Sequence, residues 1–214
     1  MQNRSHAVMS QRVEPVESLD DFPTPPWATR ALLEHVISEA SDASQSCLEP
    51  ACNRGFMAEP LKEYFNSVTA SDIADYGYGE TRDFLTQAYQ ANSFDWVITN
   101  PPFKFAEDFV HEGLRVARVG VAMLARTVFL ESVGRYDRLF KLTPPSIFAQ
   151  FTERVPMFKG RLDAKGSTAT GYAWFVWIKG CNQAPRLAWV PPCRKRLERP
   201  EDYRSESSIG RQAA

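Results

Sequence analysis

Short apolar runs alternate with helix-like segments along most of this chain. Runs of about four to eight residues, rich in Val, Ile and aromatic side chains, predict strands. They lie at 46–49, 67–71, 96–99, 118–125, 145–151 and 172–178. Segments with apolar positions three or four apart predict helices at 27–39, 56–65, 81–90, 106–116 and 129–140. Strands that alternate with helices are typical of an α/β domain with a mostly parallel sheet.

The last two predicted strands break this alternation. The segment 172–178, Tyr-Ala-Trp-Phe-Val-Trp-Ile, is apolar throughout, as expected of a strand that is buried on both faces. No helical pattern separates 145–151 from it. We therefore expect a hairpin, with the final strand antiparallel to the rest of the sheet.

Length and composition favour one soluble domain. The chain has 214 residues, of which 43% are hydrophobic, and a formal net charge of −1. Residues 1–20 and 194–214 are polar and lack periodicity, so we expect a disordered arm and a disordered tail around a single domain over 21–193. No apolar run is long enough for a membrane helix and no signal peptide is apparent, which predicts a cytoplasmic protein without a membrane partner.

The net charge and the cysteines exclude few classes of binding partner. A net charge near zero does not by itself indicate nucleic-acid binding, but a local basic face could still bind a nucleic acid. The four cysteines form no CxxC pair and no histidine lies near them, so neither a zinc site nor a disulfide framework is predicted. The sequence gives no indication of an oligomeric state.

The strand at 96–99 runs into Asn100-Pro101-Pro102-Phe103. The prolines prevent both helix formation and further strand pairing, and they push the preceding residue away from helical angles. We therefore expect a rigid, extended corner that offers the Asn100 side-chain oxygen, the Pro101 carbonyl and the Phe103 ring. Two acceptors and a flat ring suit a planar amine. By itself the tetrapeptide is equally compatible with a simple strand-terminating turn.

A second motif lies upstream, where a predicted strand runs through the loop 50–55 into a helix. Such a loop brings backbone amides and a helix N-terminus to a ligand. Asp72 ends the next strand about 20 residues beyond Glu49, where a carboxylate can bind both hydroxyls of a ribose. Glu49-Pro50 places negative charge where a pyrophosphate would lie, and GxGxxG is absent. The loop therefore suits a positively charged ligand, such as the sulfonium and amino groups of S-adenosylmethionine.

With these motifs in order, the chain resembles the N6-adenine DNA methyltransferases, specifically the small phage and prophage type, over about 21–180. The motifs that carry the resemblance are Phe22-Pro23-Thr24-Pro25, Leu48-Glu49-Pro50-Ala51-Cys52-x-x-Gly55, Ser71-Asp72-Ile73, Asp83-Phe84-Leu85 and Asn100-Pro101-Pro102-Phe103, with 151–157 and 168–177 further along. The resemblance implies a Rossmann-like class I methyltransferase fold, with a seven-stranded, mostly parallel sheet and an antiparallel last strand. It also implies S-adenosylmethionine as the cofactor and no metal.

The resemblance assigns roles to particular residues. Thr24 and Glu49 would hold the methionine end, together with Pro50, Ala51, Asn53 and Gly55 of the 50–55 loop. Asp72 would hold the ribose, Asp83 and Phe84 the adenine, and Ile73 and Asn100 would also lie next to the cofactor. Family members usually carry glycine where Asn53 stands. Asparagine tolerates left-handed backbone angles, so the turn can form, while the affinity for the cofactor is in question.

For catalysis we expect the acceptor amine to donate to the Asn100 side chain and the Pro101 carbonyl, stabilising positive charge as it develops. Phe103 would stack on the base, which must first leave the duplex. Phosphate contacts are expected from the connection between the last two strands, which the hairpin places at the same sheet edge. Its basic residues are Arg154, Lys159, Arg161 and Lys165. The basic cluster at 194–196 is better explained as part of a solvated tail.

The same corner also serves enzymes that methylate RNA base amines or protein glutamine amides, because each presents a planar nitrogen. The lead-in at 22–25 and the late segments favour adenine in DNA, with RNA as a possible partner. A different class of function is a catalytically silent, methyltransferase-like binding module, for which Asn53 is the hint. Intact Asp72 and Asn100 argue against that module.

Overall fold

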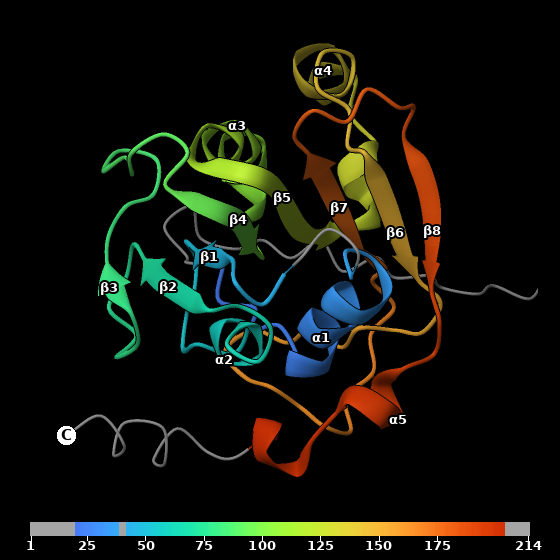
Figure 1. Cartoon of the computed structure of the whole chain (residues 1–214). Helices are drawn as coiled ribbons and strands as arrows, with labels where there is room; N and C mark the ends of the chain where they lie inside the picture. Colours follow the sequence, from blue (N-terminus) through green and yellow to red (C-terminus); the bar gives the residue numbers. More distant parts are fainter. Residues whose placement is uncertain (1–19, 39–41, 204–214) are drawn as a thin grey trace, which may run out of the picture.

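The computed structural model describes residues 20–38 and 42–203. Within them one eight-stranded sheet has the order β3-β2-β1-β4-β5-β7-β6-β8 (Figure 1). The strands are β1 Ser46–Glu49, β2 Ser67–Asp72, β3 Glu80–Thr81, β4 Phe94–Thr99, β5 Ala117–Arg126, β6 Ile147–Phe151, β7 Tyr172–Ile178 and β8 Arg186–Val190. β7 pairs antiparallel with both of its neighbours, and the other pairs are parallel. The predicted hairpin and the antiparallel direction of 172–178 are therefore confirmed.

Helices cover both faces of the sheet. The α-helices are α1 Pro26–His35, α2 Ala58–Leu61, α3 Ala106–Val116, α4 Val133–Arg135 and α5 Arg194–Leu197. Short 3-10 helices span Phe103–Phe105, Thr127–Leu130 and Pro200–Tyr203, and a π-helix spans Tyr136–Phe140. In Figure 1, α1, α2 and α5 gather on one side of the sheet, and α3 and α4 lie on the other.

Alternating side chains of the strands fill two cores. Along β4, Trp96 and Ile98 pack with Trp27 of α1, whereas Val97 packs with Phe109 of α3. Successive side chains of a strand point to opposite faces, and a parallel sheet between helices buries both of them. This explains why the central strands could be identified as continuous apolar runs.

Several predicted elements differ from the structure. The α/β class with a mostly parallel sheet is confirmed. The sheet has eight strands, whereas the resemblance implied seven and the sequence pattern predicted six; β3 and β8 are the strands that the pattern did not predict. β3 has two residues, and β8 is a mostly exposed edge strand that follows β7 in the chain. No helix forms over 81–90, where turns follow β3. The helix predicted at 56–65 is α-helical only over Ala58–Leu61, and 129–140 is divided among short 3-10, α and π segments.

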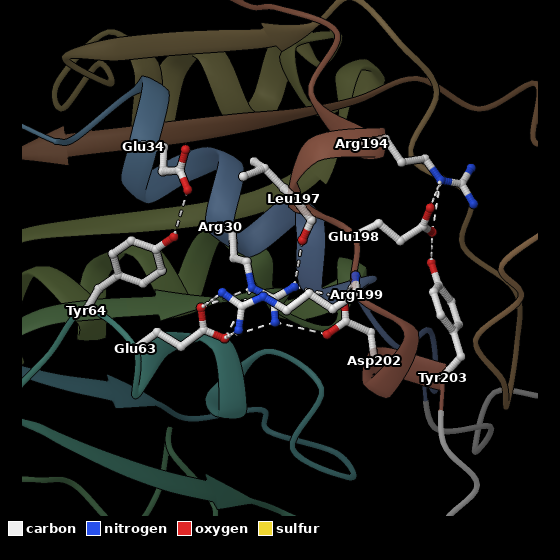
Figure 2. A network of polar contacts seen from close by, with 10 residues as sticks. All are labelled: Arg30, Glu34, Glu63, Tyr64, Arg194, Leu197, Glu198, Arg199, Asp202 and Tyr203. Atoms are coloured by element: carbon white, nitrogen blue, oxygen red, sulfur yellow. Dashed lines mark hydrogen bonds and ion pairs between the residues drawn. The ribbon is translucent and has the colours of Figure 1, made fainter.

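The tail predicted to be disordered from residue 194 is ordered as far as residue 203. Figure 2 shows the network that holds it against α1. Arg30 of α1, with only 4% of its side chain exposed, pairs with Glu63 at 2.9 Å and with Asp202 at 2.8 Å. It also donates to the Leu197 carbonyl at 2.8 Å. The arm at 1–19, the residues after 203 and the end of the helix predicted at 27–39 lie outside the described residues.

Among the described residues, no helix is both long and apolar enough to cross a membrane. No group of three or more His, Cys, Asp and Glu side chains among them could hold a metal ion.

Candidate active site

A cavity of about 640 Å³ lies where the parallel strands β1, β2 and β4 end. Parallel strands bring their carboxyl ends to one edge of the sheet, which is where ligands bind in open α/β folds. The volume is in the range of small-molecule sites. The cavity brings together most of the predicted site residues, namely Thr24, Glu49, Pro50, Ala51, Asn53, Asp72, Ile73, Asp83, Phe84, Asn100 and Pro102.

Gly55, Pro101 and Phe103 do not line this cavity. Gly55 has a φ of +85°, and an added Cβ would lie 2.5 Å from the Tyr78 ring, so glycine is needed there for the turn itself. Pro101 is buried, and the role of its carbonyl as an acceptor stays a prediction.

Glu49 is a buried acid on the cavity wall, with only 1% of its surface exposed. It accepts a hydrogen bond from the Ala51 backbone N–H at 3.1 Å. Burial raises its pKa to about 8. In the described part of the chain no basic side chain forms an ion pair with it. A cationic group of a ligand would therefore supply the ion-pair partner that the described residues do not give Glu49.

Thr24 presents a second unsatisfied group to the cavity. Its hydroxyl oxygen is buried and has no hydrogen-bond partner among the described residues. Buried polar atoms are nearly always hydrogen-bonded in native proteins, so an unpartnered hydroxyl that lines a cavity is a candidate contact for a ligand atom. An acid and a hydroxyl in one pocket match the amino and carboxylate groups of an amino-acid moiety.

Asp72 is held in place by backbone amides at the end of β2. One carboxylate oxygen accepts from the Asn53 N–H at 2.9 Å and the other from the Ala74 N–H at 3.0 Å. Burial raises the pKa of this carboxyl as well. The next residue, Ile73, lines the cavity with 58% of its surface exposed. A fixed acid beside an exposed aliphatic side chain suits a ribose joined to a flat base.

Asn53 adopts the left-handed conformation, with a φ of +50°, as predicted for an asparagine in this turn. Its amide nitrogen donates to Asp21 at 2.7 Å, and its amide oxygen accepts from the Arg54 N–H at 2.8 Å. The side chain therefore fastens the loop after β1 to the lead-in segment. It also lines the cavity, and its effect on cofactor affinity stays a prediction.

Asp83 closes a turn rather than starting a helix. Its carboxylate accepts from the Leu85 N–H at 2.9 Å and from the Thr86 hydroxyl at 2.7 Å. Phe84 is buried, with its ring centroid 5.1 Å from that of Phe109. Both predicted adenine-binding residues line the cavity, and their contact with a cofactor stays a prediction.

Asn100 follows β4, and its orientation is fixed by the lead-in segment. Its amide nitrogen donates to the Phe22 carbonyl at 2.9 Å. A carbonyl can only accept, so the NH₂ end of the amide must face Phe22. The amide oxygen of Asn100 is thus the end that can accept from a ligand in the cavity.

Asp20 belongs to the site, although it was assigned to the disordered arm. Its carboxylate accepts from the Phe103 N–H at 2.9 Å. Further cavity residues that the sequence did not single out are Phe22, Pro23, Cys52, Phe56, Met57, Tyr76, Leu85, Thr86, Lys104, Phe105 and Phe109. Phe22, Pro23, Cys52 and Leu85 lie within the recognised motifs, whereas the position of the others depends on tertiary packing.

Phe103 does not present a ring face to the cavity. It packs against the core on the α1 side of the sheet, and the Arg126 guanidinium lies 4.1 Å from its ring centroid. Stacking of a base on this ring stays a prediction, and it requires the ring face to be uncovered.

The four basic residues predicted to bind nucleic acid are exposed in the connection between β6 and β7. β6 runs parallel to β4 and β5, so this connection begins at the cavity edge of the sheet. The Gly160 N–H donates to the Asp21 carbonyl at 2.8 Å, and Arg54 donates to the Gly160 carbonyl at 3.0 Å. The connection therefore contacts the loop after β1, although Arg154, Lys159, Arg161 and Lys165 do not line the cavity.

No protein-family model matches the sequence, and no curated protein sequence matches it. Solved structures do resemble its fold. A modification subunit of a putative type I restriction enzyme from Vibrio vulnificus YJ016 matches with a TM-score of 0.58 and 13% identity, covering 87% of this chain and 50% of that one. A putative RNA methyltransferase, PH1948 from Pyrococcus horikoshii, matches with a TM-score of 0.56 and 13% identity. This match covers 80% of this chain and 91% of that one.

A predicted O-methyltransferase, Atu636 from Agrobacterium tumefaciens, matches with a TM-score of 0.50 and 13% identity, covering 78% of this chain and 86% of that one. The chain spans half the length of the modification subunit. At these identities the similarity concerns the fold. The chain has the α/β fold of the Rossmann-like methyltransferases.

Proposed function

We propose that this protein is an S-adenosylmethionine-dependent methyltransferase that acts on the N6 amino group of adenine in DNA. The observation that carries the proposal is the fixed amide of Asn100. Its NH₂ end is bound to Phe22, so its oxygen remains as an acceptor in a cavity that also holds Glu49 and Asp72.

The cofactor fits the groups that the cavity leaves unsatisfied. Glu49 and the Thr24 hydroxyl would bind its amino-acid end, and Asp72 would accept from its ribose hydroxyls. Ile73 offers an aliphatic surface for the purine. When bound, S-adenosylmethionine would supply an electrophilic methyl group: the S–CH₃ bond breaks as the N–C bond forms, the sulfur is left as a neutral thioether, and the proton of the nitrogen passes to solvent.

The protein's contribution to catalysis is to hold the acceptor nitrogen. The Asn100 oxygen and the Pro101 carbonyl would accept its two N–H bonds and stabilise positive charge as methyl transfer proceeds. The hydrogen bond to Phe22 fixes the Asn100 amide before the acceptor arrives, so little reorganisation is needed. The corner is held at its other end by Asp20.

Adenine in DNA is preferred over the other planar amines because of the ordered motifs and the basic β6–β7 connection. Four exposed basic residues on a connection that bonds to the loop after β1 suit a polyanion better than a protein glutamine amide. An RNA base amine would use them equally well, and one of the structures with a similar fold is a putative RNA methyltransferase.

Transfer of tritiated methyl groups to unmethylated DNA, RNA and protein, assayed side by side and followed by nucleoside analysis, tests the proposal. We expect label in N6-methyladenine from DNA. Label confined to RNA or protein would replace the proposed substrate. Calorimetry with S-adenosylmethionine tests the binding-module alternative, because a chain that binds no cofactor cannot be this enzyme.

Asn100→Ala should lower the rate of methyl transfer by about 100-fold to 1,000-fold, as expected when one preorganised polar group at a reacting centre is lost. The dissociation constant of S-adenosylmethionine, measured by calorimetry, should change little. Asn66→Ala is the matched control, because Asn66 is exposed and does not line the cavity. Activity of Asn100→Ala close to that of the control would remove Asn100 from the mechanism.

A further inference from the structure

Arg126 is the last residue of β5, which neighbours β4 in the sheet (Figure 1). Its half-buried guanidinium lies 4.1 Å from the ring centroid of Phe103 and 5.9 Å from that of Phe22. These aromatic residues flank Asn100, since Phe22 accepts its amide hydrogen bond and Phe103 ends the same corner. Arg126 therefore occupies the ring surface on which a base was predicted to stack.

No acidic side chain of the described residues pairs with Arg126, whose charge meets only the two aromatic rings. Within the described residues Arg126 donates no hydrogen bond and forms no ion pair, and its Nε is buried without a partner. The Nε atoms of Arg54, Arg82 and Arg135 are also buried without a partner, but each of these side chains donates another hydrogen bond, to Asp21, to Glu80 and to the Phe129 carbonyl. A buried, unpaired donor is unfavourable in the free protein, so an arginine left in this state beside the site indicates an anion that arrives with the substrate.

We infer that Arg126 is a substrate-binding residue that covers the Phe103 ring until the acceptor base replaces it, and then pairs with a phosphate of the same nucleic acid. A guanidinium suits both positions, because it stacks on aromatic faces and also binds phosphate through two parallel hydrogen bonds. The inference rests on the proposed function, since it requires a nucleic-acid acceptor.

The exchange follows from how the ring is packed. Phe103 lies against the core on the α1 side, so that side of the ring is not available to a ligand. A base can reach the ring only from the side of Arg126, where the two planar groups would compete for the same surface. A second explanation is that Arg126 only joins Phe22 to Phe103 and thereby holds the lead-in segment, and the test must separate these two roles.

The experiment compares two single-stranded oligonucleotides that contain one adenine. One has ordinary phosphodiesters, and the other has uncharged methylphosphonate linkages flanking the adenine. Binding is measured with S-adenosylmethionine present for the wild type, Arg126→Ala, Arg126→Lys and the control Arg186→Ala. Arg186 is exposed on the edge strand β8 and lies outside the cavity. Cofactor affinity, measured by calorimetry, shows that each variant is folded.

We expect the wild type and the control to prefer the charged oligonucleotide. Arg126→Ala should lose that preference, and it should bind the methylphosphonate oligonucleotide about threefold to tenfold more tightly than the wild type, because no stacked cation has to be displaced. Arg126→Lys should retain a preference for the charged oligonucleotide, because the positive charge is kept while the planar stack is lost.

Equal weakening of both oligonucleotides by Arg126→Ala, or no change in either, would overturn the inference. Equal weakening would leave Arg126 with a purely structural role. Failure of the proposed function is seen separately, because the wild type would then transfer no methyl group to DNA or RNA in the tritium assay. A methylating wild type whose Arg126→Ala variant keeps the wild-type preference contradicts only the role of Arg126.

Discussion

At the scale of single residues, the protonation of Glu49 should control cofactor binding. Burial raises its pKa to about 8, so at neutral pH most ligand-free molecules carry the neutral acid. A cationic ligand favours the carboxylate, so binding should release a proton. The dissociation constant of S-adenosylmethionine should therefore fall as the pH rises from about 6 to 8, by up to about tenfold per pH unit. Calorimetry in buffers of different ionisation enthalpy measures both the affinity and the proton release.

Glu49→Gln is the control, because it removes the titrating group while keeping the size of the side chain. This variant should bind the cofactor weakly and with little dependence on pH. A wild-type affinity that does not change between pH 6 and 8 would contradict the role of Glu49. The stability of the ligand-free protein provides a second test of the raised pKa. The folded state keeps a proton on Glu49 up to about pH 8, whereas the unfolded state releases it near pH 4.5. Stability should thus fall as the pH rises from about 4.5 to 8, relative to Glu49→Gln.

At the scale of elements, local signals predicted those strands and turns whose conformation is set by nearby residues. The central strand β4 was identifiable because its residues are buried on both faces, and Gly55 and Asn53 mark the turn after β1. The helix expected at 81–90 is reduced to a single turn. The Asp83 carboxylate caps this turn by accepting from the Leu85 N–H and the Thr86 hydroxyl. The Gln87 N–H donates to the Asp83 carbonyl at 2.8 Å, but no helix continues beyond it.

The elements that the sequence missed depend on distant partners. β8 is an edge strand with mostly exposed side chains, so it has no buried run to reveal it. The sequence of residues 194–203 resembles a polar tail. In the structure, however, Asp202 forms an ion pair with Arg30, which lies 172 residues earlier in the sequence. The site shows the same limit: Glu49, Asp72 and Asn100 were predicted from motifs, whereas the contact of Arg126 with Phe103 appears only after β5 and β4 pair.

The attachment of the α5 segment can be tested through Asp202. Its carboxylate accepts from both terminal nitrogens of Arg30, at 2.8 and 2.9 Å, and only 5% of its side chain is exposed. Asp202→Ala should lower the free energy of unfolding by about 3 kcal/mol, because it leaves a buried guanidinium with fewer partners. That value is at the lower end of the usual range because Glu63 still pairs with Arg30. Chemical denaturation measures the difference.

Glu201→Ala is the matched control, since Glu201 is the exposed neighbour of Asp202. It should change the unfolding free energy by about 0.5 kcal/mol or less. Similar stability of the two variants would mean that residues 194–203 contribute little to the fold, as a solvated tail would.

At the scale of the whole molecule, the direction of the strands joins the two halves of the proposed reaction. β1, β2 and β4 bring Glu49, Asp72 and Asn100 to one edge, and β6 delivers the basic connection to the same edge. Gly160 of that connection bonds to Asp21, which in turn accepts from Asn53 and Arg54 of the loop after β1. A nucleic acid on the connection would therefore lie beside the loop proposed to bind the cofactor.

Arg161 is the most direct test of this arrangement, because 66% of its side chain is exposed and could reach a phosphate. Among the described residues its only ion-pair partner is Asp163, with 3.9 Å between a guanidinium nitrogen and a carboxylate oxygen. Arg161→Glu should weaken DNA binding and reduce the slope of log K against log salt by about 0.9, the value for one lost phosphate contact. Lys195→Glu makes the same change of charge at an exposed residue of α5. There Arg194 and Arg196 are already paired with Glu198 and Glu34, so no phosphate site is expected.

The two slopes, measured by fluorescence anisotropy with one oligonucleotide duplex over the same range of salt, separate local contact from net charge. Both variants change the net charge of the protein equally. A general electrostatic effect would shift both curves alike, whereas a phosphate contact at Arg161 changes the slope only in that variant. Equal slopes for the two variants would place the nucleic acid elsewhere and leave the β6–β7 connection with its structural bonds to Asp21 and Arg54.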